Sequence, residues 1–129
     1  MERRLLQASI LFFGLVPVGA GMAGCVFGVD VFGHGESVGR DIDSHWRYLS
    51  GLLFAIGITF WSLTPRIEQE GPRVRLLTAL VFVGGLARLY AVSARGWPEW
   101  GMRDALVMEL LVTPGLALWR ERVQRLAKR

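Results

Sequence analysis

The sequence predicts an all-α integral membrane protein, a bundle of four transmembrane helices that run up-down-up-down in a single domain over residues 1–129. Apolar residues make up 52% of the chain and the mean hydropathy is +0.37, which favours a membrane protein over a soluble domain. Four apolar runs, each close to the roughly 20 residues that a bilayer core requires, alternate with charged segments. The helices are therefore expected at about 5–30, 45–63, 74–94 and 102–120.

The first expected helix is longer than one span needs, so it should tilt or emerge at its far end. Within it, Ala20, Gly24 and Gly28 recur at every fourth position, which predicts a small-residue face for close packing of another helix. The segment Met22-Ala23-Gly24-Cys25 also resembles a lipoprotein cleavage box, but the apolar run continues past the cysteine and favours a retained helix. As this is the single cysteine, no CxxC redox pair is available.

The second expected helix follows an acidic, glycine-rich loop. Asp43 and Ser44 are candidate N-caps, and the helix should stop at Thr64-Pro65 because proline prevents its continuation. Gly51 follows Arg47 by four residues, so the arginine should lie above a small, packable stripe and not on a lipid-facing ridge. The acids best placed to hold this arginine outward are Asp41 and Asp43.

The third and fourth expected helices each carry one charge inside an apolar run. Gly84 and Gly85 are candidate helix-packing residues of the third helix. Arg88 follows them, and an arginine at the centre of a span costs about 2.5–3.5 kcal/mol, so it should be matched by Glu109 of the fourth helix. At about 1.5 Å per residue, both groups lie roughly 9–11 Å below the outer ends of their helices. A short loop makes these helices antiparallel neighbours, which predicts a contact between the two side chains, preferably bidentate. Pro114 should loosen the fourth helix beneath the acid.

The basic residues predict the orientation in the membrane. Ten of the fifteen Lys and Arg residues fall in the N-terminal segment, in the second connection together with Arg75, and in the tail 120–129. Both termini are therefore expected in the cytoplasm, with the protein in the bacterial inner membrane and the tail against anionic lipid headgroups. The five tryptophans all lie at expected helix ends, as an interfacial aromatic belt would place them: Trp46, Trp61, Trp97, Trp100 and Trp119.

The polar side chains allow two main interpretations. In the first, Arg88 and Glu109 neutralise each other and fix the register of the bundle. In the second, Arg47, Arg88 and Glu109, with Asp41 and Asp43 nearby, line an outward-facing pocket for an anionic or lipid-like ligand. Two arginines against one intramembrane acid leave a surplus positive charge, which favours a ligand. A protonated Glu109 that faces a partner subunit is a further alternative.

Other chemistries have less support in the sequence. The pI of about 10.2 could indicate nucleic acid, but the basic residues flank apolar runs and no nucleic-acid-reading motif accompanies them. The two histidines, His34 and His45, both lie near the outer surface, so a bis-histidine haem inside the bundle lacks ligands, and no zinc-ligand spacing is present. No Ser-His-acid motif, P-loop or dinucleotide fingerprint occurs. We therefore expect no cofactor and no metal, and an enzyme is less favoured than a binding protein.

Four short segments carry a resemblance to a known family: His45-Trp46-Arg47-Tyr48-Leu49-Ser50-Gly51, Gly84-Gly85-Leu86-Ala87-Arg88-Leu89, Gly96-Trp97-Pro98, and Glu109-Leu110 with Pro114. Together they resemble the bacterial four-helix membrane proteins catalogued as domain of unknown function 4345. The resemblance covers most of the chain and implies that Arg47, Arg88 and Glu109 belong to a shared feature. A more distant similarity to DoxX-type proteins implies a membrane redox or isomerase-type enzyme as a second alternative, although a single cysteine argues against a dithiol role.

The leading functional expectation is a membrane-embedded binding or accessory module in contact with membrane lipid. The first alternative is a structural subunit of a larger membrane complex, or a homo-oligomer, that packs through the face of Ala20, Gly24 and Gly28.

Overall fold

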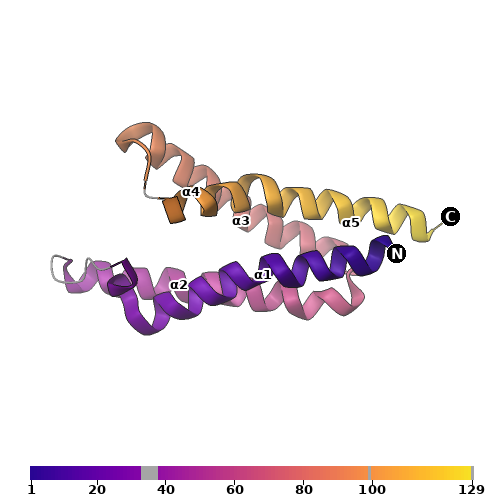
Figure 1. Cartoon of the computed structure of the whole chain (residues 1–129), viewed down its shortest axis with the longest axis horizontal. Helices are drawn as coiled ribbons and strands as arrows, with labels where there is room; N and C mark the ends of the chain where they lie inside the picture. Colours follow the sequence, from indigo (N-terminus) through magenta and orange to yellow (C-terminus); the bar gives the residue numbers. More distant parts are fainter. Residues whose placement is uncertain (33–37, 99, 129) are drawn as a thin grey trace. The chain divides into compact units, whose positions relative to one another are not determined.

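A computed structural model describes residues 1–32, 38–98 and 100–128, and these residues form helices and turns without a strand. The elements in chain order are α1 (Glu2–Phe27), the 3-10 turn η1 (Gly28–Phe32), α2 (Arg40–Leu63), the 3-10 turn η3 (Thr64–Arg66), α3 (Gly71–Arg95), α4 (Trp100–Val107), the π turn η4 (Met108–Val112) and α5 (Thr113–Ala127) (Figure 1). The predicted all-α class is confirmed.

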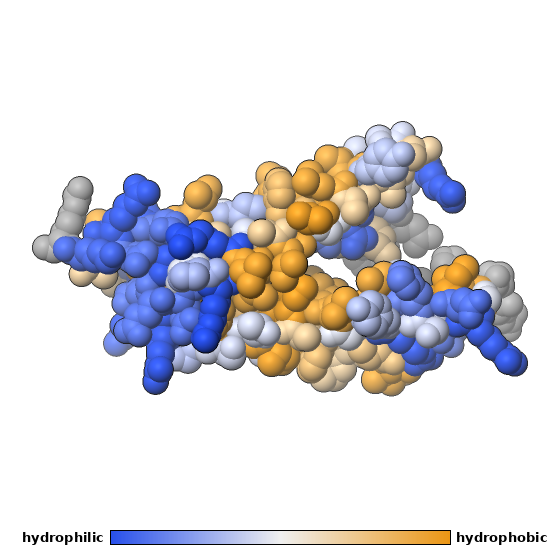
Figure 2. Space-filling view, turned by 180° about the vertical axis from the view of Figure 1, so that it is seen from behind, coloured by the Kyte–Doolittle hydropathy of each residue, from blue (hydrophilic) through white to orange (hydrophobic). Residues whose placement is uncertain are grey.

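Three of the described helical segments are long and apolar enough to cross a membrane, namely Glu2–Val31, Arg40–Arg66 and Gly71–Arg95. On the face that Figure 2 shows, hydrophobic residues cover the middle of the helices and hydrophilic residues lie toward their ends. Length and patterning together indicate a membrane protein.

The chain divides into two compact units, which are described in turn. The α1–α2 unit comprises Ala8–Thr64, and the α3–α5 unit comprises Met1–Gln7 together with Pro65–Arg129.

Glycines bring α1 and α2 into close contact. A methyl group on Gly21 would lie only 2.6 Å from the backbone nitrogen of Phe54, and one on Gly57 would lie 2.7 Å from the side chain of Val18. The predicted small-residue face therefore exists, and Gly24 and Gly28 belong to it because both are buried against α2. Ala20, by contrast, is exposed, so its assignment to this face is wrong. The face instead follows the 3.6-residue period of the helix from Gly28 back through Gly24 and Gly21.

The start of α2 differs from the prediction. The helix begins at Arg40, and its N-cap is Gly39, whose carbonyl accepts hydrogen bonds from the backbone N–H groups of Ile42 and Asp43. The prediction of Asp43 and Ser44 as N-caps is therefore wrong, since both already lie within the first turns of the helix. The predicted end holds, as α2 stops at Leu63 and Pro65 follows in a 3-10 turn.

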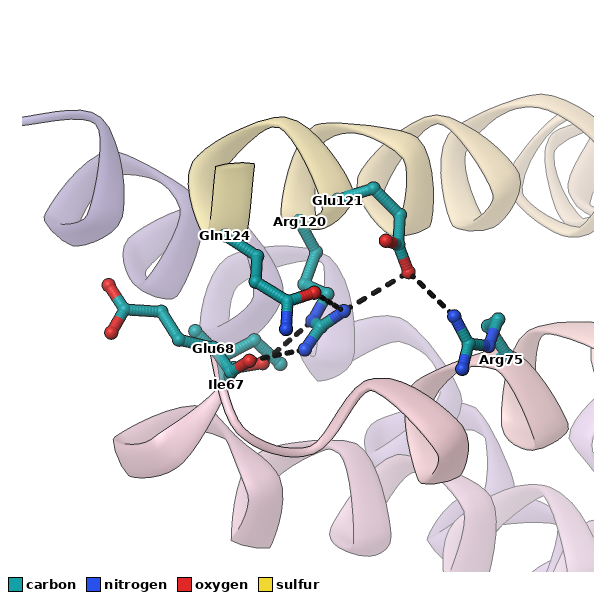
Figure 3. Close-up of polar contacts among 6 residues, drawn as sticks. All are labelled: Ile67, Glu68, Arg75, Arg120, Glu121 and Gln124. Atoms are coloured by element: carbon teal, nitrogen blue, oxygen red, sulfur yellow. Dashed lines mark hydrogen bonds and ion pairs between the residues drawn. The ribbon is translucent and has the colours of Figure 1, made fainter. Parts of the chain in front are cut away.

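In the α3–α5 unit, one arginine that was expected at the membrane surface is buried. Only 2% of Arg120 is exposed, and its guanidinium donates to the carbonyl of Ile67 at 2.9 Å and to that of Glu68 (Figure 3). Carbonyls in a connection between helices lack helical partners, and the arginine supplies the missing donors. Arg120 thus fastens α5 to the segment before α3, and its buried guanidinium is not exposed at the surface as the sequence predicted for the tail.

Candidate functional site

The predicted pair of Arg88 and Glu109 is present in the α3–α5 unit. Arg88 donates from Nε to Oε2 of Glu109 at 3.0 Å and from Nη2 to Oε1 at 3.1 Å. This bidentate geometry is the strongest form of an arginine–carboxylate contact. The side chain of Glu109 is 16% exposed and that of Arg88 is 32% exposed, so the carboxylate is the more deeply buried partner. The predicted contact is confirmed.

Gly85 permits α3 to approach the acid. Its α-carbon lies close to the π turn η4. A methyl group on Gly85 would lie 2.9 Å from Cβ of Glu109 and 2.8 Å from a methyl of Leu110. Gly84, one residue earlier, has open space around it and is exposed. Of the two glycines that the sequence offered, Gly85 is therefore the packing residue, whereas Gly84 has no packing role within this structure.

A π turn carries Glu109. Pro114 has no N–H and its ring clashes with the carbonyl four residues earlier, so an α-helix cannot pass through this position undisturbed. The helix contains a π turn over Met108–Val112 just before this proline. The N–H and the hydroxyl of Thr113 both donate to the carbonyl of Met108. Single π turns often mark functional positions. The prediction that Pro114 loosens the helix is thus confirmed in a specific form.

Met102 is a neighbour of the pair that the sequence did not indicate. Its sulfur accepts a contact from Nη1 of Arg88 at 2.9 Å. Arg88 has five N–H donors, of which the described contacts use three, one of them with a weak sulfur acceptor. Two strong donors remain on a cation that lies within an apolar helix. The methionine could have been found from its position near the start of α4, seven residues before Glu109 and two helical turns away on the same side.

The second predicted arginine, Arg47, lies in the α1–α2 unit with different partners. Its Nε donates to Asp43 at 2.8 Å, and its Nη1 donates to the carbonyls of Cys25 and Val26 at 2.7 and 2.9 Å. These two carbonyls belong to the last turn of α1, where helical partners are missing. Arg47 therefore caps the end of α1 from α2.

Asp43 and Gly28 complete this cap. The second carboxylate oxygen of Asp43 accepts a hydrogen bond from the N–H of Val29 at 3.1 Å. Gly28 has a φ of +61°, which glycine adopts without strain and which ends α1. A methyl group on Gly28 would also collide with Arg47 and Asp43. The predicted pairing of Arg47 with Asp43 is confirmed, while its described contacts do not include Asp41, which is exposed.

The structure changes the charge balance on which the ligand hypothesis was based. Arg47 is matched by Asp43 and Arg88 is matched by Glu109, so neither cluster has a surplus positive charge among the residues that the structure describes. The two clusters belong to different units, and a joint pocket of Arg47 with Arg88 stays a prediction.

The remaining predicted residues do not take part in the described contacts of Arg47 or Arg88. Gly51 is half-buried and would bring a methyl group into ordinary contact, 3.7 Å from the sulfur of Cys25. His34 lies outside the described residues. Among the residues that the structure does describe, no group of three or more His, Cys, Asp or Glu side chains could hold a metal ion.

A family model with the description "Domain of unknown function (DUF4345)" matches residues 5–120. No curated protein and no solved structure matches the chain.

Proposed function

Since the chain belongs to the domain of unknown function 4345 family, we propose that it is a four-span membrane protein that serves as a binding or accessory module, with the Arg88–Glu109 pair as its recognition site. The ligand is a lipid-like molecule that carries a hydrogen-bond acceptor. The observation that carries this proposal is the unused donor capacity of a paired arginine within an apolar helix.

The fourth span is supported by the last helical stretch. This stretch is helical from Trp100 to Ala127, and from Ala105 to Trp119 it carries no charge except that of Glu109, which is matched by Arg88. Four spans joined by short connections would run up-down-up-down. The distribution of Lys and Arg would then put both termini in the cytoplasm, and in a bacterium with two membranes the protein would lie in the inner one.

The chemistry of the pair favours a neutral ligand over an anion. Glu109 cancels the charge of Arg88, so an added anion would be buried next to a pair that has no net charge to offer it. The two N–H groups of Arg88 that the described contacts leave unused still need acceptors, and no water competes for them in the hydrocarbon region. An ester or quinone carbonyl on an amphiphile would supply such an acceptor at the cost of little desolvation.

The test is the lipid content of the purified protein. The wild-type protein and an Arg95→Leu control, in which an exposed arginine two turns along α3 is removed, are expected to retain one amphiphile in mild detergent. The double variant Arg88→Leu/Glu109→Leu removes donors and acceptor together without leaving an unpaired charge, and it should lose that molecule while it keeps its helical content. Retention by the double variant, or a wild-type protein without an amphiphile, would contradict the proposal. A protein partner that copurifies in fixed ratio would instead favour the structural-subunit alternative.

A further inference from the structure

A second feature of the α3–α5 unit lies at the opposite end of α3 from Arg88. A shallow hollow of about 330 Å³ is lined by Arg75, Thr78, Ala79 and Phe82 of α3 and by Pro114 and Ala117 of α5. Its walls are mostly apolar, with one cation at its end. The hollow exists because two alanines and a proline occupy the positions where α3 and α5 face each other.

The charges at the end of the hollow are unbalanced. Arg75 and Arg120 both approach the same oxygen of Glu121, at 3.2 and 3.1 Å, so two cations share one carboxylate (Figure 3). Arg120 is buried and directed at backbone carbonyls, whereas 63% of the Arg75 side chain is exposed. Of the five N–H donors of Arg75, the described contacts use one. This end of the hollow is therefore suited to an anion.

Along α3 the lining of the hollow changes from charged to polar to apolar, which is the order of the phosphate, the ester groups and the acyl chains in a phospholipid. Thr78 lies one turn inward from Arg75, and Phe82 lies two turns inward, roughly 10 Å away along the axis. The lining from α5 changes in the same direction. Pro114, Ala117 and Glu121 lie on one side of that helix, and Glu121 lies at the same end of the hollow as Arg75.

Thr78 supplies an independent sign of a missing partner. Its Oγ1 is buried and has no hydrogen-bond partner among the described residues, although a buried hydroxyl is normally satisfied. Threonine in a helix has two accessible rotamers, so the hydroxyl can turn toward the hollow that the residue lines. A glycerol ester carbonyl, which lies just below the phosphate in a phospholipid, is an acceptor at this level.

From these observations we infer that the hollow between α3 and α5 binds one glycerophospholipid with an anionic headgroup. Arg75 binds the phosphate, Thr78 donates to an ester carbonyl, and one acyl chain lies along Ala79, Phe82 and Ala117. Net positive charge at the end of the hollow selects an anionic lipid over a zwitterionic one.

The experiment measures lipid binding to the full chain in detergent, with phosphatidylglycerol and phosphatidylcholine as probes and native mass spectrometry as the readout. Arg75→Ala should weaken phosphatidylglycerol binding about tenfold and abolish the preference over phosphatidylcholine, because a charged hydrogen bond is lost. The matched control is Arg73→Ala, which removes an equally exposed arginine that pairs with Glu70 away from the hollow. Thr78→Val keeps the shape of the side chain and should weaken both lipids by a smaller, similar factor.

Ala117→Trp fills the hollow and should abolish binding of both lipids, whereas Leu118→Trp, at the neighbouring position that is 72% exposed, should leave it unchanged. Equal affinities in Ala117→Trp and Leu118→Trp would overturn the inference, and so would an Arg75→Ala variant with wild-type preference. If the filled variant does not fold, Arg75→Ala and Thr78→Val decide the question. A change from oligomer to monomer in Ala117→Trp with unaltered lipid binding would overturn it in favour of a second copy of the chain.

Discussion

Arg47 in the α1–α2 unit and Arg88 in the α3–α5 unit are both paired with a carboxylate, yet the pairs are built in different ways. Arg47 is held by an acid four residues away on its own helix, and it also donates to two carbonyls at the end of α1. Arg88 is held by an acid from another helical segment, 21 residues later, through both carboxylate oxygens. One arginine completes a helix end, and the other joins two helices.

The surroundings of the two arginines differ as well. Arg40, Asp41, Asp43 and His45 precede Arg47, so its remaining donors lie beside a polar segment. Arg88 has apolar runs on both sides, and nothing in its own helix can satisfy it. An unpaired partner should therefore be costly at Arg88 and tolerable at Arg47. The comparison shows why a paired arginine is by itself weak evidence for a site, and why its remaining donors and depth have to be considered.

The largest effect is expected for Glu109→Leu, which leaves Arg88 uncompensated. Loss of one partner of a buried pair costs about 3–5 kcal/mol. The double variant Arg88→Leu/Glu109→Leu should recover part of this loss, because no unpaired charge remains. The measurement is unfolding by SDS in detergent micelles, analysed as a double-mutant cycle. Losses that simply add would show that the two side chains do not act as a pair.

The next effect tests the approach of α3 to the π turn. Gly85→Ala should destabilise the protein by about 1–3 kcal/mol, because the methyl group has to displace Glu109 and Leu110. Gly84→Ala is the matched control, since its methyl group meets open space and alanine is the better helix former by up to about 1 kcal/mol. Thermal unfolding of the two variants in the same detergent gives the comparison. Equal stabilities would mean that this close approach does not position the acid.

A smaller effect is expected at the end of α1. Asp43→Asn should destabilise the protein modestly, because it weakens the hydrogen bonds to Arg47 and Val29 at a partly exposed position. Asp41→Asn removes the same charge from the same turn of α2, and it should change stability by less than about 0.5 kcal/mol. Amide exchange at Val29 reports the cap directly and should accelerate only in the Asp43 variant. Faster exchange in both variants would indicate a general charge effect.

The sequence predicted the fold class and the Arg88–Glu109 contact because both depend on simple quantities. Long apolar runs fix the helices, and the number of residues from each helix end fixes the depth of the two charges. It did not predict the phase of the α1 face, because the spacing of four at Ala20 holds only approximately for a helix with 3.6 residues per turn. Which small residues face a neighbour depends on where that neighbour lies, and the sequence alone does not contain this position.

Two further misses have the same origin. In the sequence, Arg120 belongs to a basic tail. Its burial depends on hydrogen bonds to the carbonyls of Ile67 and Glu68, which come close to it only in the folded chain. The start of α2 at Arg40 depends on a cap made by the backbone of Gly39, for which no side chain gives a signal. Pro114 indicated a disturbance of the last helix, but a helix can accommodate a proline by a kink, a break or a π turn, and the sequence does not distinguish these three.

The smallest effect tests whether the π turn supports the Arg88 pair in a way that has no counterpart at Arg47. Thr113→Val removes the hydroxyl bond to the carbonyl of Met108 and should cost up to about 1 kcal/mol. Thr59→Val is the control, because its hydroxyl bonds to a carbonyl four residues earlier in regular α-helix. If the π turn holds Glu109 toward Arg88, the cost of Thr113→Val should shrink in the Arg88→Leu/Glu109→Leu background, while the cost of Thr59→Val should stay the same. A cost of Thr113→Val that is equal in both backgrounds would mean that the turn only accommodates Pro114, and that the position of the acid is set by Gly85 and the pair itself.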